Sequence, residues 1–120
     1  MRRATVRVHG EAAGFLEEVE RGRRYRFVYG PEYRGVPVSL TMPVATRAYD
    51  FDEFPPFFDG LLPEGFQLDA LLRQRKIDAS DFFSQLVAVG GDLVGAVTVD
   101  EASETDDVDE GGLADPERSR

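Results

Sequence analysis

Two kinds of hydrophobic spacing divide this sequence at Pro55-Pro56. Before the two prolines, apolar residues occupy every second position in several short runs, which is the period of a half-buried strand. After them, apolar residues recur three and four positions apart, which is the period of a helix with one buried side. Strands first and helices later predict an α+β domain with a small, mainly antiparallel sheet.

Alternating residues predict strands at 4–9 and 24–29, and residues 15–19 can form a second strand between them. We expect Gly10 and Gly14 to bracket the turn between the first two. A charged turn separates the second strand from the third. This part of the chain therefore predicts a meander of short strands.

A fourth run, residues 36–42, places four apolar side chains on one face. It contains Pro37 and is followed by Pro43, and because proline cannot donate to a ladder, we expect an edge or irregular strand. Residues 45–51 are ambiguous, and 94–99 predict a closing strand. The sheet should have about five to six short strands in total. The apolar residues of the fourth run are Val36, Val38, Leu40 and Met42.

Two to three helices are expected to pack on this sheet. Residues 57–62 predict a short helix or turn. Pro63 suits the first position of the next helix, which should run to about Arg75. Asp78 is a candidate N-cap for a further helix, and the glycine pair at 90–91 should end it.

The net charge of −9 is spread unevenly. Residues 1–99 carry 14 acids and 12 bases, whereas residues 100–120 carry nine acids and two arginines. We therefore expect a folded domain at 1–99 and an acidic, disordered tail at 100–120. Arginines gather near the second turn, where they form either the solvated face of a hairpin or an acid-binding patch. They are Arg21, Arg23, Arg24 and Arg26.

Charge and hydropathy also limit the partners and the location. An acidic chain gains little from nucleic-acid phosphates, so we expect no direct nucleic-acid binding. No run of about 18 apolar residues occurs, so we expect no membrane span. The N-terminal arginines are not followed by an apolar signal-peptide region, so a cytoplasmic location is expected.

The sequence offers few groups for catalysis. It has no cysteine and one histidine, His9, so neither a metal site nor an activated nucleophile is predicted. The glycine-rich stretch 90–96 lacks the Lys-Ser/Thr of a phosphate loop and predicts a tight helix-to-strand turn. We expect no catalytic, metal or cofactor-binding residue, and we expect the chain to act by binding rather than as an enzyme.

The segment 57–66 is crowded with aromatic residues and prolines. In a helix, Phe66 would lie about 160° from Leu68, away from the apolar face that Leu68 shares with Leu71 and Leu72. Phe66 is then either a second core contact or an exposed anchor of the kind that often dominates protein interfaces. The candidate partner-binding residues are Leu62, Pro63, Glu64, Gly65 and Phe66.

Three stretches together resemble the N-terminal domain of HipA-type serine/threonine kinases. They are FFDGLLPEG at 57–65, VGGDLVGAV at 89–97 and GVPVSLTMP at 35–43. Kinases of this type are toxins of toxin–antitoxin systems. A free-standing form of the domain, HipS, acts as the antitoxin in HipB–HipS–HipT systems, and this chain is similar to it.

The resemblance implies a partner and a function. The chain should dock on a HipT- or HipA-like kinase and neutralise it, with Phe66 and the loop 62–65 reaching toward the kinase cleft. The alternative is a non-inhibitory subunit that completes the kinase fold or bridges it to a HipB-like helix-turn-helix protein. Some relatives have tryptophan after the LLPEG motif, and phenylalanine at position 66 keeps a ring but lacks the indole N–H donor.

Overall fold

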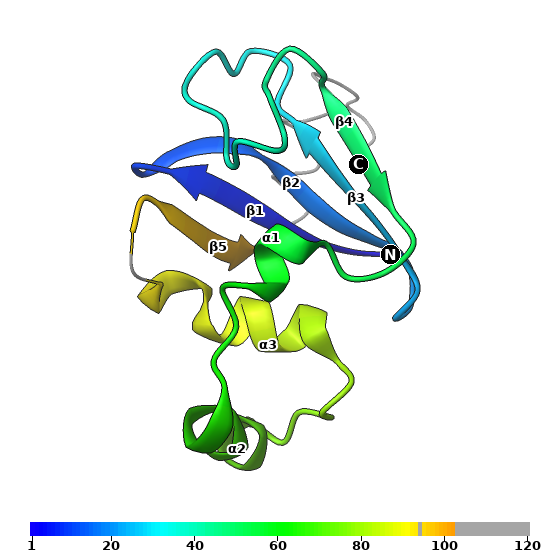
Figure 1. Cartoon of the computed structure of the whole chain (residues 1–120), viewed down its shortest axis with the longest axis vertical. Coiled ribbons are helices and arrows are strands. Elements are labelled where there is room, and N and C mark those ends of the chain that lie inside the picture. The colour runs from blue at the N-terminus through cyan, green and yellow to red at the C-terminus, as the bar shows by residue number, and fades with distance from the viewer. Residues whose placement is uncertain (94, 103–120) are drawn as a thin grey trace, which may run out of the picture.

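The computed structural model describes residues 1–93 and 95–102 (Figure 1). These residues form five strands, three α-helices and one short 3₁₀ helix. The strands are β1 (Arg2–Val8), β2 (Glu11–Glu20), β3 (Arg24–Tyr29), β4 (Ala48–Phe51) and β5 (Val97–Glu101). The helices are α1 (Pro56–Asp59), α2 (Gly65–Arg75), α3 (Phe82–Val89) and the 3₁₀ helix η1 (Gly90–Asp92).

The five strands form one sheet in the order β4-β3-β2-β1-β5. Every neighbouring pair is antiparallel, including the non-local pair of β1 and β5. The predicted α+β class with an antiparallel sheet is therefore confirmed. Strand β3 has the predicted bounds, and the ambiguous run 45–51 contributes β4.

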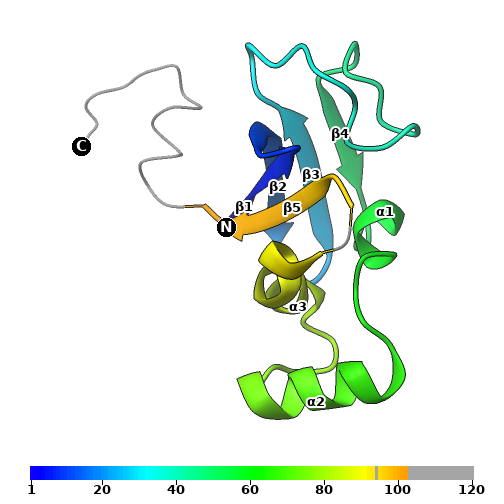
Figure 2. The ribbon, with the colours of Figure 1, turned by 90° about the vertical axis from the view of Figure 1, so that its left-hand side faces the viewer.

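The core lies between the sheet and helices α1 and α3. Phe58 of α1 and Phe83 and Leu86 of α3 are buried against apolar side chains of the strands. The rings of Phe27 and Phe58 lie 6.0 Å apart, which joins α1 directly to β3. Figures 1 and 2 show α2 beyond α3, on the side away from the sheet.

Residues 36–42 form no strand, contrary to the prediction. Val38 and Met42 are buried, whereas Val36 and Leu40 are exposed, so the four apolar residues do not share one face. The Tyr29 hydroxyl accepts a hydrogen bond from the Val38 N–H at 2.9 Å and donates one to the Met42 carbonyl. These bonds tie the segment to the core without a ladder, which suits a stretch interrupted by proline.

The first turn is tighter than predicted. His9 and Gly10 alone form it, with φ of 52° and 83°, so His9 is not on a strand face. Gly14 lies inside β2, where a Cβ atom would be only 2.2 Å from the Val28 carbonyl oxygen. Glycine is therefore required at position 14 for close backbone approach rather than for a turn.

Several element ends differ from the prediction, and strands β1 and β2 have other bounds than the predicted 4–9 and 15–19. Helix α2 begins at Gly65 and not at Pro63, and the N-cap of α3 is Asp81 and not Asp78. Strand β5 begins later than position 94 and continues through Glu101. The rest of the predicted acidic tail, 103–120, lies outside the described residues. Over the described ranges, no helix has the length and apolar character needed to cross a membrane.

Candidate partner-binding surface

The connection between α1 and α2 starts from a fixed point in the core. Phe58 is fully buried, and the backbone N–H groups of Leu61 and Leu62 donate to the carbonyls of Phe58 and Asp59 at 3.0 and 3.1 Å. Leu61 and Leu62 are themselves partly buried against the core. The beginning of the predicted binding segment is therefore held rigidly.

Gly65 sets the direction in which α2 leaves this connection. Its φ is +61°, in the region that side-chain-bearing residues rarely adopt. A Cβ at Gly65 would meet no atom within 4 Å, so the backbone conformation is what requires glycine. Glu64 precedes it in an extended conformation and makes no side-chain capping bond to α2.

Helix α2 lies apart from the core, and none of its residues is buried. Leu68, Leu71 and Leu72 are half-buried. Phe66 is 92% exposed, so of the two alternatives left open by the sequence the second core contact is wrong and the side chain is exposed. An isolated 11-residue helix is marginally stable in water, so this helix depends on the few contacts that its half-buried leucines make.

A groove of about 680 Å³ separates α2 from the rest of the domain. One wall is the 60–63 connection, the second is the α2 face containing Gln67 and Leu71, and the third includes Val89 and Leu93. Leu62 and Pro63 therefore line the groove, whereas Phe66 is outside its lining. The five predicted residues form two adjoining surfaces: a groove wall and an exposed ridge of Glu64, Gly65 and Phe66.

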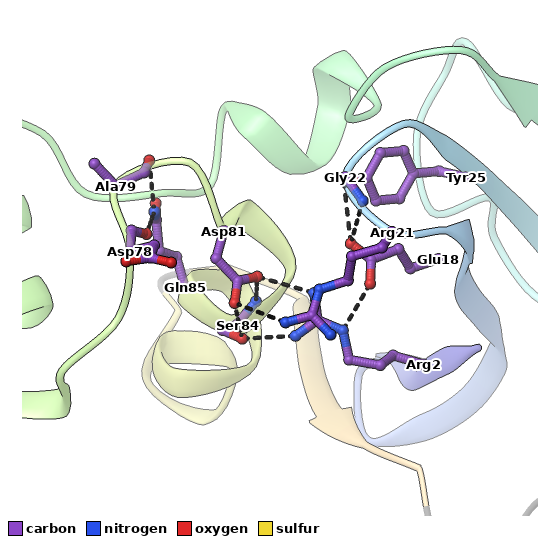
Figure 3. Close-up of polar contacts among 10 residues, drawn as sticks. All are labelled: Arg2, Glu18, Arg21, Gly22, Tyr25, Asp78, Ala79, Asp81, Ser84 and Gln85. Carbon is purple, nitrogen blue, oxygen red and sulfur yellow. Dashed lines mark hydrogen bonds and ion pairs between the residues drawn. The ribbon is translucent and has the colours of Figure 1, made fainter.

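An ionic network fastens α3 to the sheet (Figure 3). The Arg2 guanidinium donates to Glu18 Oε1 at 2.6 Å, to Ser84 Oγ at 2.7 Å and to Asp81 Oδ1 at 2.9 Å. Asp81 also caps α3 by accepting from the Ser84 N–H at 3.1 Å. Arg2 thus joins β1, β2 and the start of α3 through one side chain.

The network keeps its two acids ionised. Burial raises the pKa of Glu18, but hydrogen bonds from Arg2 and the Gly22 N–H outweigh it, so the pKa lies below its usual value. Burial also raises the pKa of Asp81. Its hydrogen bonds with Arg2 and Ser84 outweigh burial, so this pKa too lies below its usual value. Satisfied charges of this kind stabilise a fold; they do not leave a group poised for proton transfer.

Sequence analysis did not predict this network. Its members are far apart in the chain, so no local pattern joins them. The available signal was the position of Asp81 directly before the apolar run of α3, which is the better N-cap pattern than Asp78. The Asp78 and Ala79 carbonyls instead accept bonds from Gln85 Nε2, both at 3.1 Å, which hold the linker from α2 against α3.

The arginines near the second turn pair with acids of this same chain. Arg23 and Arg24 lie 3.8 and 3.6 Å from Glu20, and Arg26 lies 2.7 Å from Asp50. These pairs match the solvated face of a hairpin more closely than an acid-binding patch. Among residues 1–93 and 95–102, no cluster of three or more His, Cys, Asp or Glu could hold a metal ion.

Comparison with known proteins identifies the family. The model of the HipA N-terminal domain family matches residues 4–100. A solved structure of the N-terminal domain of HipA toxin has a TM-score of 0.68 and 31% identity, and the match covers 87% of this chain and 95% of that one. A protein of Haemophilus influenzae described as uncharacterized is 36% identical over 101 residues, 84% of this chain and 93% of its own length. The chain therefore belongs to the HipA N-terminal domain family.

Proposed function

We propose that this chain is an antitoxin-like binding protein that docks on a HipT- or HipA-type serine/threonine kinase and neutralises it. Membership of the HipA N-terminal domain family supports a toxin–antitoxin-related role. The observation that carries the proposal is Phe66, a 92% exposed aromatic side chain on a helix with no buried residue. A monomeric domain gains nothing from such a ring in water, whereas an interface gains a large apolar area.

The proposed contact has a rigid base and a projecting tip. The base is the connection through Leu61 and Leu62, which is hydrogen-bonded back to α1. The tip is Phe66, which α2 presents immediately after the positive-φ Gly65. A preorganised tip loses little conformational freedom on binding, so more of its contact energy appears as affinity. Insertion of this tip into the kinase cleft would block the cleft sterically.

Phe66→Ala tests the proposal. Loss of a central aromatic contact typically costs about 2 kcal/mol or more, which is roughly a 30-fold loss of affinity. We therefore expect Phe66→Ala to neutralise a purified partner kinase far less well in a phosphorylation assay. Its circular dichroism spectrum should match that of the unaltered protein.

Leu40→Ala is a matched control. Leu40 is also 92% exposed, but it belongs to the 31–47 segment at the end of the molecule opposite α2 (Figure 1). We expect Leu40→Ala to leave neutralisation unchanged. Full neutralisation by a folded Phe66→Ala protein would remove Phe66 from the proposed contact.

The same assay separates the antitoxin from a non-inhibitory subunit. A subunit that only completes the kinase fold, or bridges it to a HipB-like protein, would leave kinase activity unchanged or raise it. An antitoxin lowers activity in proportion to the fraction of kinase bound.

A further inference from the structure

Helix α2 differs in charge from the rest of the chain. Residues 65–76 hold three bases against one acid, a net charge of +2, whereas the whole chain has −9. The bases are Arg73, Arg75 and Lys76, and all three are exposed. Helix α2, which we propose contacts the kinase, is thus a basic region of an acidic protein.

These bases have no acidic partner among the described residues. The ion pairs found in residues 1–93 and 95–102 involve arginines of the strands and the second turn and none of the α2 bases. Bases in the last turn do interact favourably with the helix dipole, which is a local effect of tenths of a kcal/mol to about 1 kcal/mol. That effect does not use the outward ends of the side chains, which remain available for a partner.

The basic end aligns with Phe66. Arg73 follows Phe66 by seven positions, which in an α-helix is about 20° around the axis and about 10 Å along it. Lys76 follows at the C-cap of the helix. Asp69 is the one carboxylate of α2 and lies between the two ends, about 60° from Phe66 around the axis. One side of α2 therefore presents an aromatic ring at its start and cations at its end.

We propose that α2 docks lengthwise on a partner surface that has an apolar pocket for Phe66 and carboxylates roughly 10–15 Å away for Arg73 and Lys76. This deepens the proposed function and depends on it, because the partner is the same kinase. A cationic end opposite acids fixes the direction of the helix in the interface and speeds encounter. It also offsets the repulsion that a chain of net charge −9 would meet at an acidic surface.

The double variant Arg73→Glu/Lys76→Glu tests this arrangement. We expect its kinase affinity at low salt to fall at least about tenfold, mainly through slower association. Binding of the unaltered protein should weaken from about 50 mM to about 500 mM salt, and the variant should show little or no such weakening. Surface plasmon resonance gives both the rates and the salt dependence.

Arg23→Glu/Arg24→Glu is the matched control. It makes the same change in charge at two exposed arginines that are not part of α2. Both arginines lie beside Glu20. We expect a change in affinity of no more than about twofold. An equal loss of kinase affinity in both double variants would mean that binding depends on net charge alone, which would overturn the proposal.

Reversed charges at a helix C-terminus can unwind it, so Arg73→Gln/Lys76→Gln provides a milder variant. We expect this variant to keep the helical circular dichroism signal. Its loss of kinase affinity and of salt dependence should be smaller than in the charge-reversal variant. If the unaltered protein binds the kinase and both the glutamine variant and the charge-reversal variant bind it equally well, lengthwise docking is overturned. The proposed function would then remain intact. Failure of the unaltered protein to bind the kinase would overturn both.

Discussion

Helices α2 and α3 follow one another in the chain but are held in different ways. Helix α3 has eight residues, a side-chain cap from Asp81, and buried Phe83, Gln85 and Leu86. Helix α2 has eleven residues, no side-chain cap and no buried residue. The longer helix is thus the less attached one, which separates a helix that maintains the fold from one whose surface is available for a partner.

The largest expected difference between the two helices is in the cost of losing a leucine. Leu86→Ala removes a fully buried side chain of α3 and should lower the free energy of unfolding by about 2–5 kcal/mol. Leu72→Ala removes a half-buried side chain of α2 and should cost less than about 1 kcal/mol. Urea denaturation of both variants measures the difference, and equal losses would contradict the division between the helices.

The glycine pair after α3 gives a second contrast. A Cβ at Gly90 would lie 1.9 Å from the Val99 carbonyl oxygen, whereas a Cβ at Gly91 would meet nothing within 4 Å. Gly90→Ala should therefore force α3 and β5 apart, at a cost of about 1–3 kcal/mol or more. Gly91→Ala is the control and should change the unfolding midpoint little. If Gly90→Ala hardly lowers the free energy of unfolding, α3 packs less closely against β5 in solution than in the structure.

The Arg2 network should make the attachment of α3 sensitive to acid. The pKa values of Glu18 and Asp81 are lowered in the folded protein, so the unfolded chain binds more protons as pH falls. The two carboxylates contribute fully to the free energy of unfolding at pH values above their pKa in the unfolded chain. This contribution is lost as the pH falls through their lower pKa in the folded protein, so stability should fall below about pH 5. Denaturation at a series of pH values measures this.

Arg2→Met provides the comparison for that pH dependence. It leaves the Glu18 carboxylate buried without its main donor and should cost about 1–3 kcal/mol near neutral pH. The difference from the unaltered protein should shrink in acid, because protonated carboxyls no longer require the guanidinium. If the free energy of unfolding of the two proteins falls in parallel down to about pH 3, the Arg2 network is not what makes the fold acid-sensitive.

The smallest effect is expected at Phe66. Because its ring is exposed, Phe66→Ala should change the free energy of unfolding by less than about 0.5 kcal/mol. Thermal or urea denaturation of the variant already designed for the kinase assay gives this value. A loss of about 1.5 kcal/mol or more would mean that the ring packs against the domain in solution, which would weaken its assignment as an interface anchor.

Local patterns predicted some elements well and others poorly, for physical reasons. Strand β3 has the expected bounds because Tyr25, Phe27 and Tyr29 alternate in the sequence and are all buried. Residues 36–42 also alternate, yet they form no ladder and are bound at Val38 and Met42 by the hydroxyl of Tyr29. Alternation predicts a strand only where a neighbouring strand can accept the ladder.

The candidate site was partly accessible to sequence analysis. The rotation of Phe66 away from the leucines followed from helical spacing alone. Its exposure did not, because this depends on where Gly65 directs α2 relative to the core. The Arg2 network could not be predicted either, since it joins residues 16 and 79 positions apart.

The pairing of β5 with β1 has a consequence for how the domain is made. A ribosome makes β1 before β5, with residues 9–96 between them, so one edge of β1 lacks its partner strand while that stretch is made. An open strand edge is a template for aggregation, and pairing between such distant segments is slow. Nascent chains halted before Val97 would therefore be substrates for chaperones or proteases rather than half-working versions of the domain.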